Sequence, residues 1–108
     1  MNRGDIYLVR KPGTNDPKKR RAFVVVSRQV LLDSNFSSVI CAPVYSTRSG
    51  LSTQVDLGRE SGLKHESTVS CDDLVSLQRG RLTDFIGAVP AARLDDLDRA
   101  LAIALGLQ

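Results

Sequence analysis

Six basic side chains lie between residues 10 and 21, where the only acidic side chain is Asp16. Four of them are consecutive, Lys18-Lys19-Arg20-Arg21, and come just before the apolar segment 23–26. Ammonium and guanidinium groups placed this close together produce a positive potential that attracts polyanions. Since the run joins a turn-rich loop to the start of a buried strand, we expect its side chains to point in defined directions. The alternative is a solvated basic loop without a ligand.

Few groups are available for metal or cofactor chemistry. His65 is the only histidine, and the two cysteines, Cys41 and Cys71, lie in apolar segments where buried, reduced thiols are expected. One histidine and two cysteines cannot supply the four ligands of a structural zinc ion. Asp72 and Asp73 should point to opposite faces if they lie in a strand. We therefore expect no metal and no cofactor, and interpret His65 as a surface residue, with a catalytic role as the alternative.

Short apolar or alternating segments, separated by turn residues, predict the strands that position the basic and hydroxyl side chains. Glycine, asparagine and proline in residues 12–17 predict a turn between the first strand and the second. The near-continuous apolar segment 38–44 is expected to be covered on both faces. The alternating segments 53–57 and 67–71 are typical of strands with one solvent-exposed face. The predicted strands are 5–10, 21–27, 38–44, 53–57, 67–71 and 85–89.

A helix is predicted after the last strand. Pro90 fits its first turn, where the missing N–H group does no harm. Leucines then recur at spacings of three and four residues, which is typical of one apolar helix face. This stripe should cap the sheet or contact a partner, and consists of Leu94, Leu97, Leu101 and Leu105.

These elements predict one α+β domain over residues 1–108, a small, strongly curved sheet or partly open antiparallel β-barrel with a C-terminal helix. A length of 108 residues with 42% hydrophobic and 25% charged residues suits one small core. There is no charged segment followed by a long apolar run at the N-terminus and no stretch of about 18 apolar residues anywhere. We therefore expect a cytoplasmic protein without a membrane span. The net charge of +3 is compatible with polyanions but identifies none.

Four motifs, taken in order over nearly the whole chain, resemble the MazF/PemK/Kid toxins. They are Arg3-Gly4-Asp5-Ile6-Tyr7, the segment 21–27, Cys41-Ala42-Pro43-Val44-Tyr45-Ser46 and the segment 68–73. The resemblance implies a homodimer of an SH3-like barrel of the CcdB/MazF type. It also implies a sequence-selective endoribonuclease of a bacterial type II toxin–antitoxin pair. The expected partners are single-stranded RNA and a cognate antitoxin whose acidic C-terminal segment lies across the active groove.

Metal-independent RNA cleavage uses the ribose 2′-hydroxyl as the nucleophile and yields a 2′,3′-cyclic phosphate and a 5′-hydroxyl. Such a site must remove one proton, supply another and stabilise charge on the phosphoryl oxygens. A pair of histidines is excluded within one subunit, which leaves guanidinium and hydroxyl groups. Arg21 matches the family's catalytic arginine, although Ala22 replaces the proline that usually follows. The planar guanidinium donates to two phosphate oxygens at once.

The catalytic hydroxyl has more than one candidate. Family members commonly end the third strand with Pro-Ile-Thr-Ser, and direct alignment places Tyr45 at the threonine. Ser46 ranks equally, and Thr47 is available if the strand end is shifted by a bulge. A purely structural Tyr45 is the alternative. Asp72 aligns with the family's acidic residue, and is a candidate base or a residue that orients Arg21.

The predicted RNA contacts surround these residues. Relatives carry cations at the positions of Ser70 and Val75, and both are absent here. The alternatives are a CcdB-like gyrase poison without enzymatic activity, or an RNA-binding module of the same fold that has lost its activity. The residues predicted to bind RNA are Lys18, Lys19, Arg20, Arg48, Thr47, Ser70 and Ser76.

Overall fold

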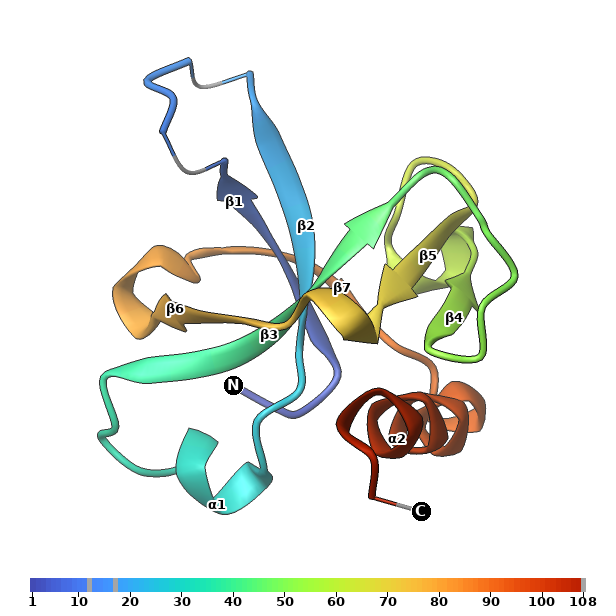
Figure 1. Cartoon of the computed structure of the whole chain (residues 1–108). Coiled ribbons are helices and arrows are strands. Elements are labelled where there is room, and N and C mark those ends of the chain that lie inside the picture. Colours follow the sequence, from blue (N-terminus) through green and yellow to red (C-terminus); the bar gives the residue numbers. More distant parts are fainter. Residues whose placement is uncertain (12, 17, 108) are drawn as a thin grey trace.

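The computed structural model describes residues 1–11, 13–16 and 18–107. Over these residues, seven antiparallel strands form one curled sheet that is flanked by a long helix near the C-terminus (Figure 1). The strands are β1 (Asp5–Arg10), β2 (Arg20–Val25), β3 (Ser38–Tyr45), β4 (Gln54–Leu57), β5 (Ser67–Ser70), β6 (Val75–Gln78) and β7 (Asp84–Ala88). The helices are α1 (Gln29–Leu32) and α2 (Ala91–Leu105), with 3-10 turns η1 (Arg59–Ser61), η2 (Cys71–Asp73) and η3 (Arg79–Arg81).

The strand β3 is the centre of the sheet because it changes partner along its length. Its first half pairs with β6, its middle with β2, and its last two residues, Val44 and Tyr45, pair with β5. The sheet order is β4-β5-β3-β2-β1-β7, with β6 beside β3. This exchange of partners curls the sheet, and the predicted partly open antiparallel barrel with a C-terminal helix is confirmed.

Two apolar clusters lie on opposite faces of the central strands. Val24 belongs to one cluster and Val25 to the other, and both side chains are fully buried. In β3, Cys41 and Ala42 are divided between the clusters in the same way. The prediction that segment 38–44 is covered on both faces therefore holds, except at Ile40, which is 43% exposed.

Helix α2 packs against β4 and the turn η2. Leu97 is fully buried, and Leu94 and Leu101 pack against the same cluster, whereas Leu105 is 57% exposed. Most of the leucine stripe thus covers the chain's own core and is not left for a partner. Pro90 precedes the helix as its N-cap and is not part of its first turn. No helix in the described part of the chain is long and apolar enough to cross a membrane.

Several predicted elements differ from the structure. All four residues of β5 are buried, so the prediction of one solvent-exposed face was wrong. The hydroxyl groups of Thr68 and Ser70 find partners within the chain, in the Val55 carbonyl and the Asp73 carboxylate. The predicted strand 67–71 ends at Ser70, and residues 71–73 form the turn η2. Neither β6 nor α1 was predicted. Both are only four residues long, too short for a clear periodic pattern.

Candidate functional site

A hollow of about 620 Å³ lies where the neighbouring strands β2, β3 and β5 meet the turn η2. Arg21 of β2 and Tyr45, the last residue of β3, lie together in it. The guanidinium carbon of Arg21 is 4.6 Å from the centre of the Tyr45 ring, and its Nη1 donates to the Val44 carbonyl at 3.1 Å. The ring face and the carbonyl fix the guanidinium in place. Its remaining N–H groups are available to an anion.

The phenol of Tyr45 is held by a carboxylate. Its hydroxyl donates to Asp73 Oδ2 at 3.3 Å, and the Ser70 hydroxyl donates to the same oxygen at 3.0 Å. Burial of the ring and the neighbouring Asp73 carboxylate raise the pKa of Tyr45, while Arg21 opposes them. The phenol therefore keeps its proton at neutral pH and is a proton donor there.

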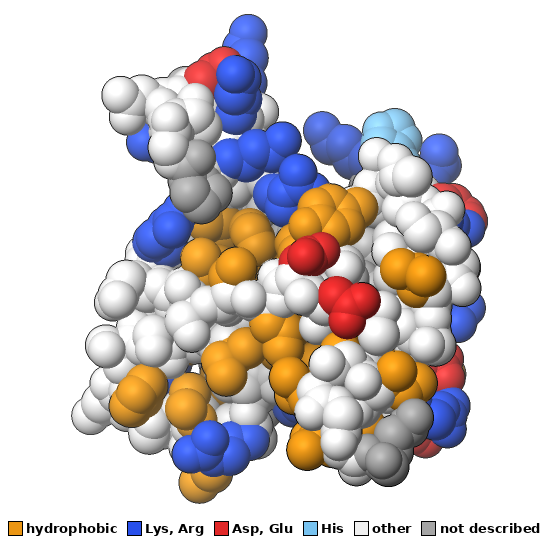
Figure 2. Space-filling view, in the orientation of Figure 1, with side chains coloured by type: hydrophobic (Ala, Val, Ile, Leu, Met, Phe, Trp, Pro, Cys, Tyr) orange, Lys and Arg blue, Asp and Glu red, His pale blue; other side chains and the backbone are white. Residues whose placement is uncertain are grey.

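The second carboxylate, Asp72, lies in the same hollow and accepts a hydrogen bond of 2.6 Å from the Thr53 hydroxyl. Asp72 and Asp73 were expected to point to opposite faces if they lay in a strand, and that condition is not met. They belong to the turn η2 and not to a strand, so both side chains line one hollow. Figure 2 shows this face of the molecule, with many Lys and Arg side chains above hydrophobic and acidic ones at the centre of the view.

The loop after β3 completes the hollow with hydroxyl groups. Ser46, Thr47 and Ser49 line it, together with Leu51 and Gln54. Both alternative hydroxyls of the sequence analysis are thus beside Arg21. Of the predicted site residues, the hollow brings together Arg21, Tyr45, Ser46, Thr47, Ser70 and Asp72.

Residues 2–105 match the family described as PemK-like, MazF-like toxin of type II toxin-antitoxin system. Endoribonuclease MazF2 of Mycobacterium bovis is 30% identical over 112 aligned positions, which cover 99% of this chain and 98% of that protein. The chain belongs to this toxin family.

Solved structures of MazF toxins share its fold. The Mycobacterium tuberculosis toxin MazF-mt6 is 27% identical and has a TM-score of 0.83, over 96% of this chain and 98% of that one. A mycobacterial endoribonuclease solved in complex with its cognate antitoxin is 26% identical and has a TM-score of 0.86, over 100% of this chain and 97% of that one.

Arg48 of this MazF-like chain does not line the hollow. Its Nη2 lies 3.3 Å from both the Leu57 and the Ser67 carbonyl oxygens, and its Nη1 lies 2.8 Å from Glu66. A further ion pair of 3.5 Å joins it to Asp56. The guanidinium thus binds the loop after β3 to the ends of β4 and β5.

Four other predicted RNA contacts, Lys18, Lys19, Arg20 and Ser76, also lie outside the hollow. Ser76 is exposed on β6, opposite Ile40. Lys18 and Lys19 are exposed in the loop between β1 and β2 and are not among the residues that line the hollow.

A smaller hollow of about 300 Å³ adjoins the first and shares Arg21, Tyr45 and Ser46 with it. Arg20 lines this second hollow, as do Lys64 and the exposed His65. Arg20 also forms an ion pair of 3.0 Å with Asp84. Arg20 thus has a carboxylate as its partner, whereas Arg21 has a carbonyl group and an aromatic ring.

Two partners were not predicted from the sequence: Asp73 as the partner of Tyr45 and Thr53 as the partner of Asp72. One signal was present: aspartate is depleted in strands, so two consecutive aspartates after an alternating segment indicate a turn. Among the described residues, no group of three or more His, Cys, Asp or Glu side chains is placed to hold a metal ion.

Proposed function

We propose that this chain is an endoribonuclease toxin that cleaves single-stranded RNA without a metal ion. The observation that carries the proposal is the contact of Arg21 with Tyr45, whose hydroxyl is held by Asp73. Relatives matched over nearly their full length are named endoribonucleases. Single-stranded RNA is the proposed substrate because unpaired bases expose the edges by which a short sequence is read.

In the proposed reaction, Arg21 donates to the non-bridging oxygens of the scissile phosphate, where negative charge develops. Asp73 accepts the proton of the ribose 2′-hydroxyl while the 2′-oxygen forms a bond to phosphorus. The bond from phosphorus to the 5′-oxygen breaks, and Tyr45 donates its proton to that oxygen. Transfer of the proton from Asp73 to Tyr45 along their hydrogen bond restores both groups.

The other polar groups of the hollow have supporting roles in this proposal. Asp72, the base candidate of the sequence analysis, is held by Thr53 and is proposed to shape the site electrostatically. Ser46 and Thr47 contribute hydroxyl donors to the bound RNA, and Ser70 orients Asp73.

Incubation of the purified protein with a long RNA, with and without EDTA, tests the proposal. We expect cleavage in both samples, with 5′-hydroxyl ends. Cleavage that EDTA abolishes, or that leaves 5′-phosphate ends, would contradict it. Intact RNA together with inhibited DNA supercoiling would favour a gyrase poison instead.

We also propose that the chain acts as a homodimer in the cytoplasm. Since α2 covers the chain's own core, other apolar side chains are the ones available to a second copy. Those exposed on or near α1, β3, β6 and the end of α2 are Val30, Phe36, Ile40, Val75, Leu105 and Leu107. Burial of such side chains stabilises a dimer of small subunits. Light scattering should give twice the monomer mass of 11.8 kDa, and the monomer mass at micromolar concentration would contradict the dimer.

The proposed partner is a cognate antitoxin whose acidic segment competes with RNA for the Arg21 hollow. A similar structure was solved as an endoribonuclease in complex with its cognate antitoxin. Because carboxylates and phosphates bind the same cations, both affinities should weaken as salt rises. Simultaneous binding of antitoxin and RNA, measured by fluorescence anisotropy, would contradict the shared site.

A further inference from the structure

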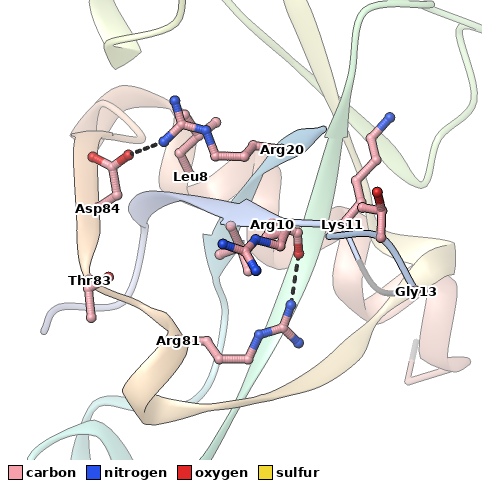
Figure 3. Close-up of a pocket in the computed structure, with 10 residues that line it drawn as sticks. Leu8, Arg10, Lys11, Gly13, Arg20, Arg81, Thr83 and Asp84 are labelled. Carbon is pink, nitrogen blue, oxygen red and sulfur yellow. Dashed lines mark hydrogen bonds and ion pairs between the residues drawn. The ribbon is translucent and has the colours of Figure 1, made fainter. Parts of the chain in front are cut away.

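A third and larger hollow, of about 880 Å³, lies beyond Arg20. It is bounded by the end of β1, the loop between β1 and β2, and the segment that leads from η3 into β7. Figure 3 shows Arg10, Arg20 and Arg81 around it, with Thr83 and Asp84 along β7 and its approach. None of the residues that react in the proposed mechanism lines this hollow.

This hollow carries a surplus of positive charge. Arg10, Lys11, Arg20 and Arg81 line it, and the only carboxylate among its lining residues is Asp84. Asp84 forms an ion pair of 3.0 Å with Arg20. The charges of Arg10, Lys11 and Arg81 are not neutralised by this carboxylate. Such a cluster in a concave surface attracts anions more strongly than cations scattered over a convex one.

Arg81 is held in position although its side chain is exposed. Its Nη2 donates to the Arg10 carbonyl at 2.8 Å, which joins the turn η3 to the end of β1 (Figure 3). In the part of the chain that the structure describes, the Arg10 and Lys11 side chains make neither a hydrogen bond nor an ion pair. Arg81 is therefore preorganised to bind an anion, while Arg10 and Lys11 have donors free to join it.

The three hollows are linked by the residues that they share. The smallest hollow shares Arg21 and Tyr45 with the candidate active site, and it shares Lys11 and Arg20 with the large basic hollow. A chain molecule bound at Arg21 can thus extend past Arg20 into the basic hollow. RNA carries one negative charge per nucleotide, which suits cations spaced along a track.

We propose that the large basic hollow binds the phosphodiester backbone of the RNA segment that flanks the cleaved bond. The inference rests on the proposed function, since it assigns a second part of the same RNA to this surface. An acidic peptide fits the hollow less well. A peptide that folds on binding needs buried apolar anchors. Among the described residues that line the hollow, the large apolar side chains are Leu8, which is partly buried, and Val9, which is 3% exposed.

Binding to an RNA that cannot be cleaved tests the inference. An RNA cut by the wild-type protein is resynthesised with a 2′-O-methyl group at the cleaved nucleotide, once with long flanks and once trimmed to the cleaved motif. The variant is Arg10→Gln/Arg81→Gln. The control is Arg28→Gln/Arg59→Gln, which removes the same charge from two exposed arginines that line none of the three hollows.

The variant should bind the long RNA on the order of tenfold more weakly, and its plot of log affinity against log salt should be less steep by about 1.4, or about 0.7 per cation removed. Its affinity for the trimmed RNA, and the rate at which it cleaves the trimmed unmodified RNA, should equal those of the wild type. The control should match the wild type on both RNAs.

Equal weakening on long and trimmed RNA, or no weakening on either, would overturn the inference. Unchanged RNA affinity with weaker binding of an oligoglutamate peptide would assign the hollow to an acidic peptide instead. The proposed function fails separately: if the wild-type protein cuts no RNA, cleavage is refuted, while its binding to long and short RNAs of arbitrary sequence still tests the hollow.

Discussion

The guanidinium of Arg21 donates to one carbonyl and stacks on Tyr45, whereas that of Arg48 contacts two carbonyls and two carboxylates. Both arginines lie near the end of β3, and both were predicted to act on RNA. The difference shows that the partners of a cation decide whether it can bind a substrate. Arg21 has donors left for phosphate, while Arg48 uses its donors to fasten a loop.

The largest expected effect follows replacement of Arg21. Arg21→Ala should lower the rate of RNA cleavage by about 10²- to 10³-fold, because it removes a donor aimed at developing phosphoryl charge. The thermal unfolding midpoint should change little. Single-turnover cleavage of an end-labelled RNA measures the rate, and a variant that cuts at nearly the wild-type rate would remove Arg21 from the mechanism.

Replacement of Asp73 tests the hydrogen bond on which the Tyr45 assignment depends. Asp73→Asn should slow cleavage by about 10²-fold through loss of the base. It should also change the pH profile. Asp73 raises the pKa of Tyr45, and the phenol donates only while protonated, so activity falls as pH rises through that pKa. Without the Asp73 charge, the fall should begin at a lower pH than in the wild type.

Asp72→Asn is the matched control for that profile, because Asp72 is bound by Thr53 and makes no hydrogen bond to Tyr45. Its alkaline limb should coincide with that of the wild type. An Asp73→Asn variant whose alkaline limb also coincides with the wild-type limb would contradict the link between Asp73 and Tyr45.

Arg48→Ala should have the smallest effect on chemistry and a clear effect on stability. The loss of hydrogen bonds to Leu57 and Ser67 should lower the free energy of unfolding by about 1 kcal/mol, since the exposed ion pairs add little. The cleavage rate should fall only a few-fold, through looser positioning of Ser46 and Thr47. Urea unfolding and cleavage assays of one preparation measure both, and a 100-fold loss of rate with unchanged stability would place Arg48 on the substrate.

The fold was largely predictable because its signals are local. Alternation and apolar runs indicated six of the strands, and the spacing of Leu94, Leu97 and Leu101 indicated α2 and its buried face. The strand β6 was not predicted because it is only four residues long, follows a turn and has exposed side chains at every position except Leu77. Its place beside β3 depends on pairing between distant segments, which single-sequence patterns do not reveal.

The residues of the candidate site were predictable only where they lie at the ends of predicted strands. Arg21 and Tyr45 lie together because β2 and β3 are neighbours, and the family resemblance had placed both residues in the site. The pairing of Tyr45 with Asp73 was not predictable from an expected strand, because it depends on the turn η2. Arg48 was misjudged for a similar reason, since its partners come from β4 and from the approach to β5 and its first residue.

Tyr45 is proposed to donate the proton to the departing 5′-oxygen, and Tyr45→Phe removes that proton donor. The variant keeps the ring under Arg21 and removes only the hydroxyl, so cleavage of normal RNA should slow by about 10²-fold or more. An RNA with sulfur in place of the 5′-bridging oxygen needs no proton on its leaving group. Tyr45→Phe should therefore cleave this RNA as fast as the wild type does, and an equally large defect on both RNAs would contradict the role of Tyr45 as the proton donor.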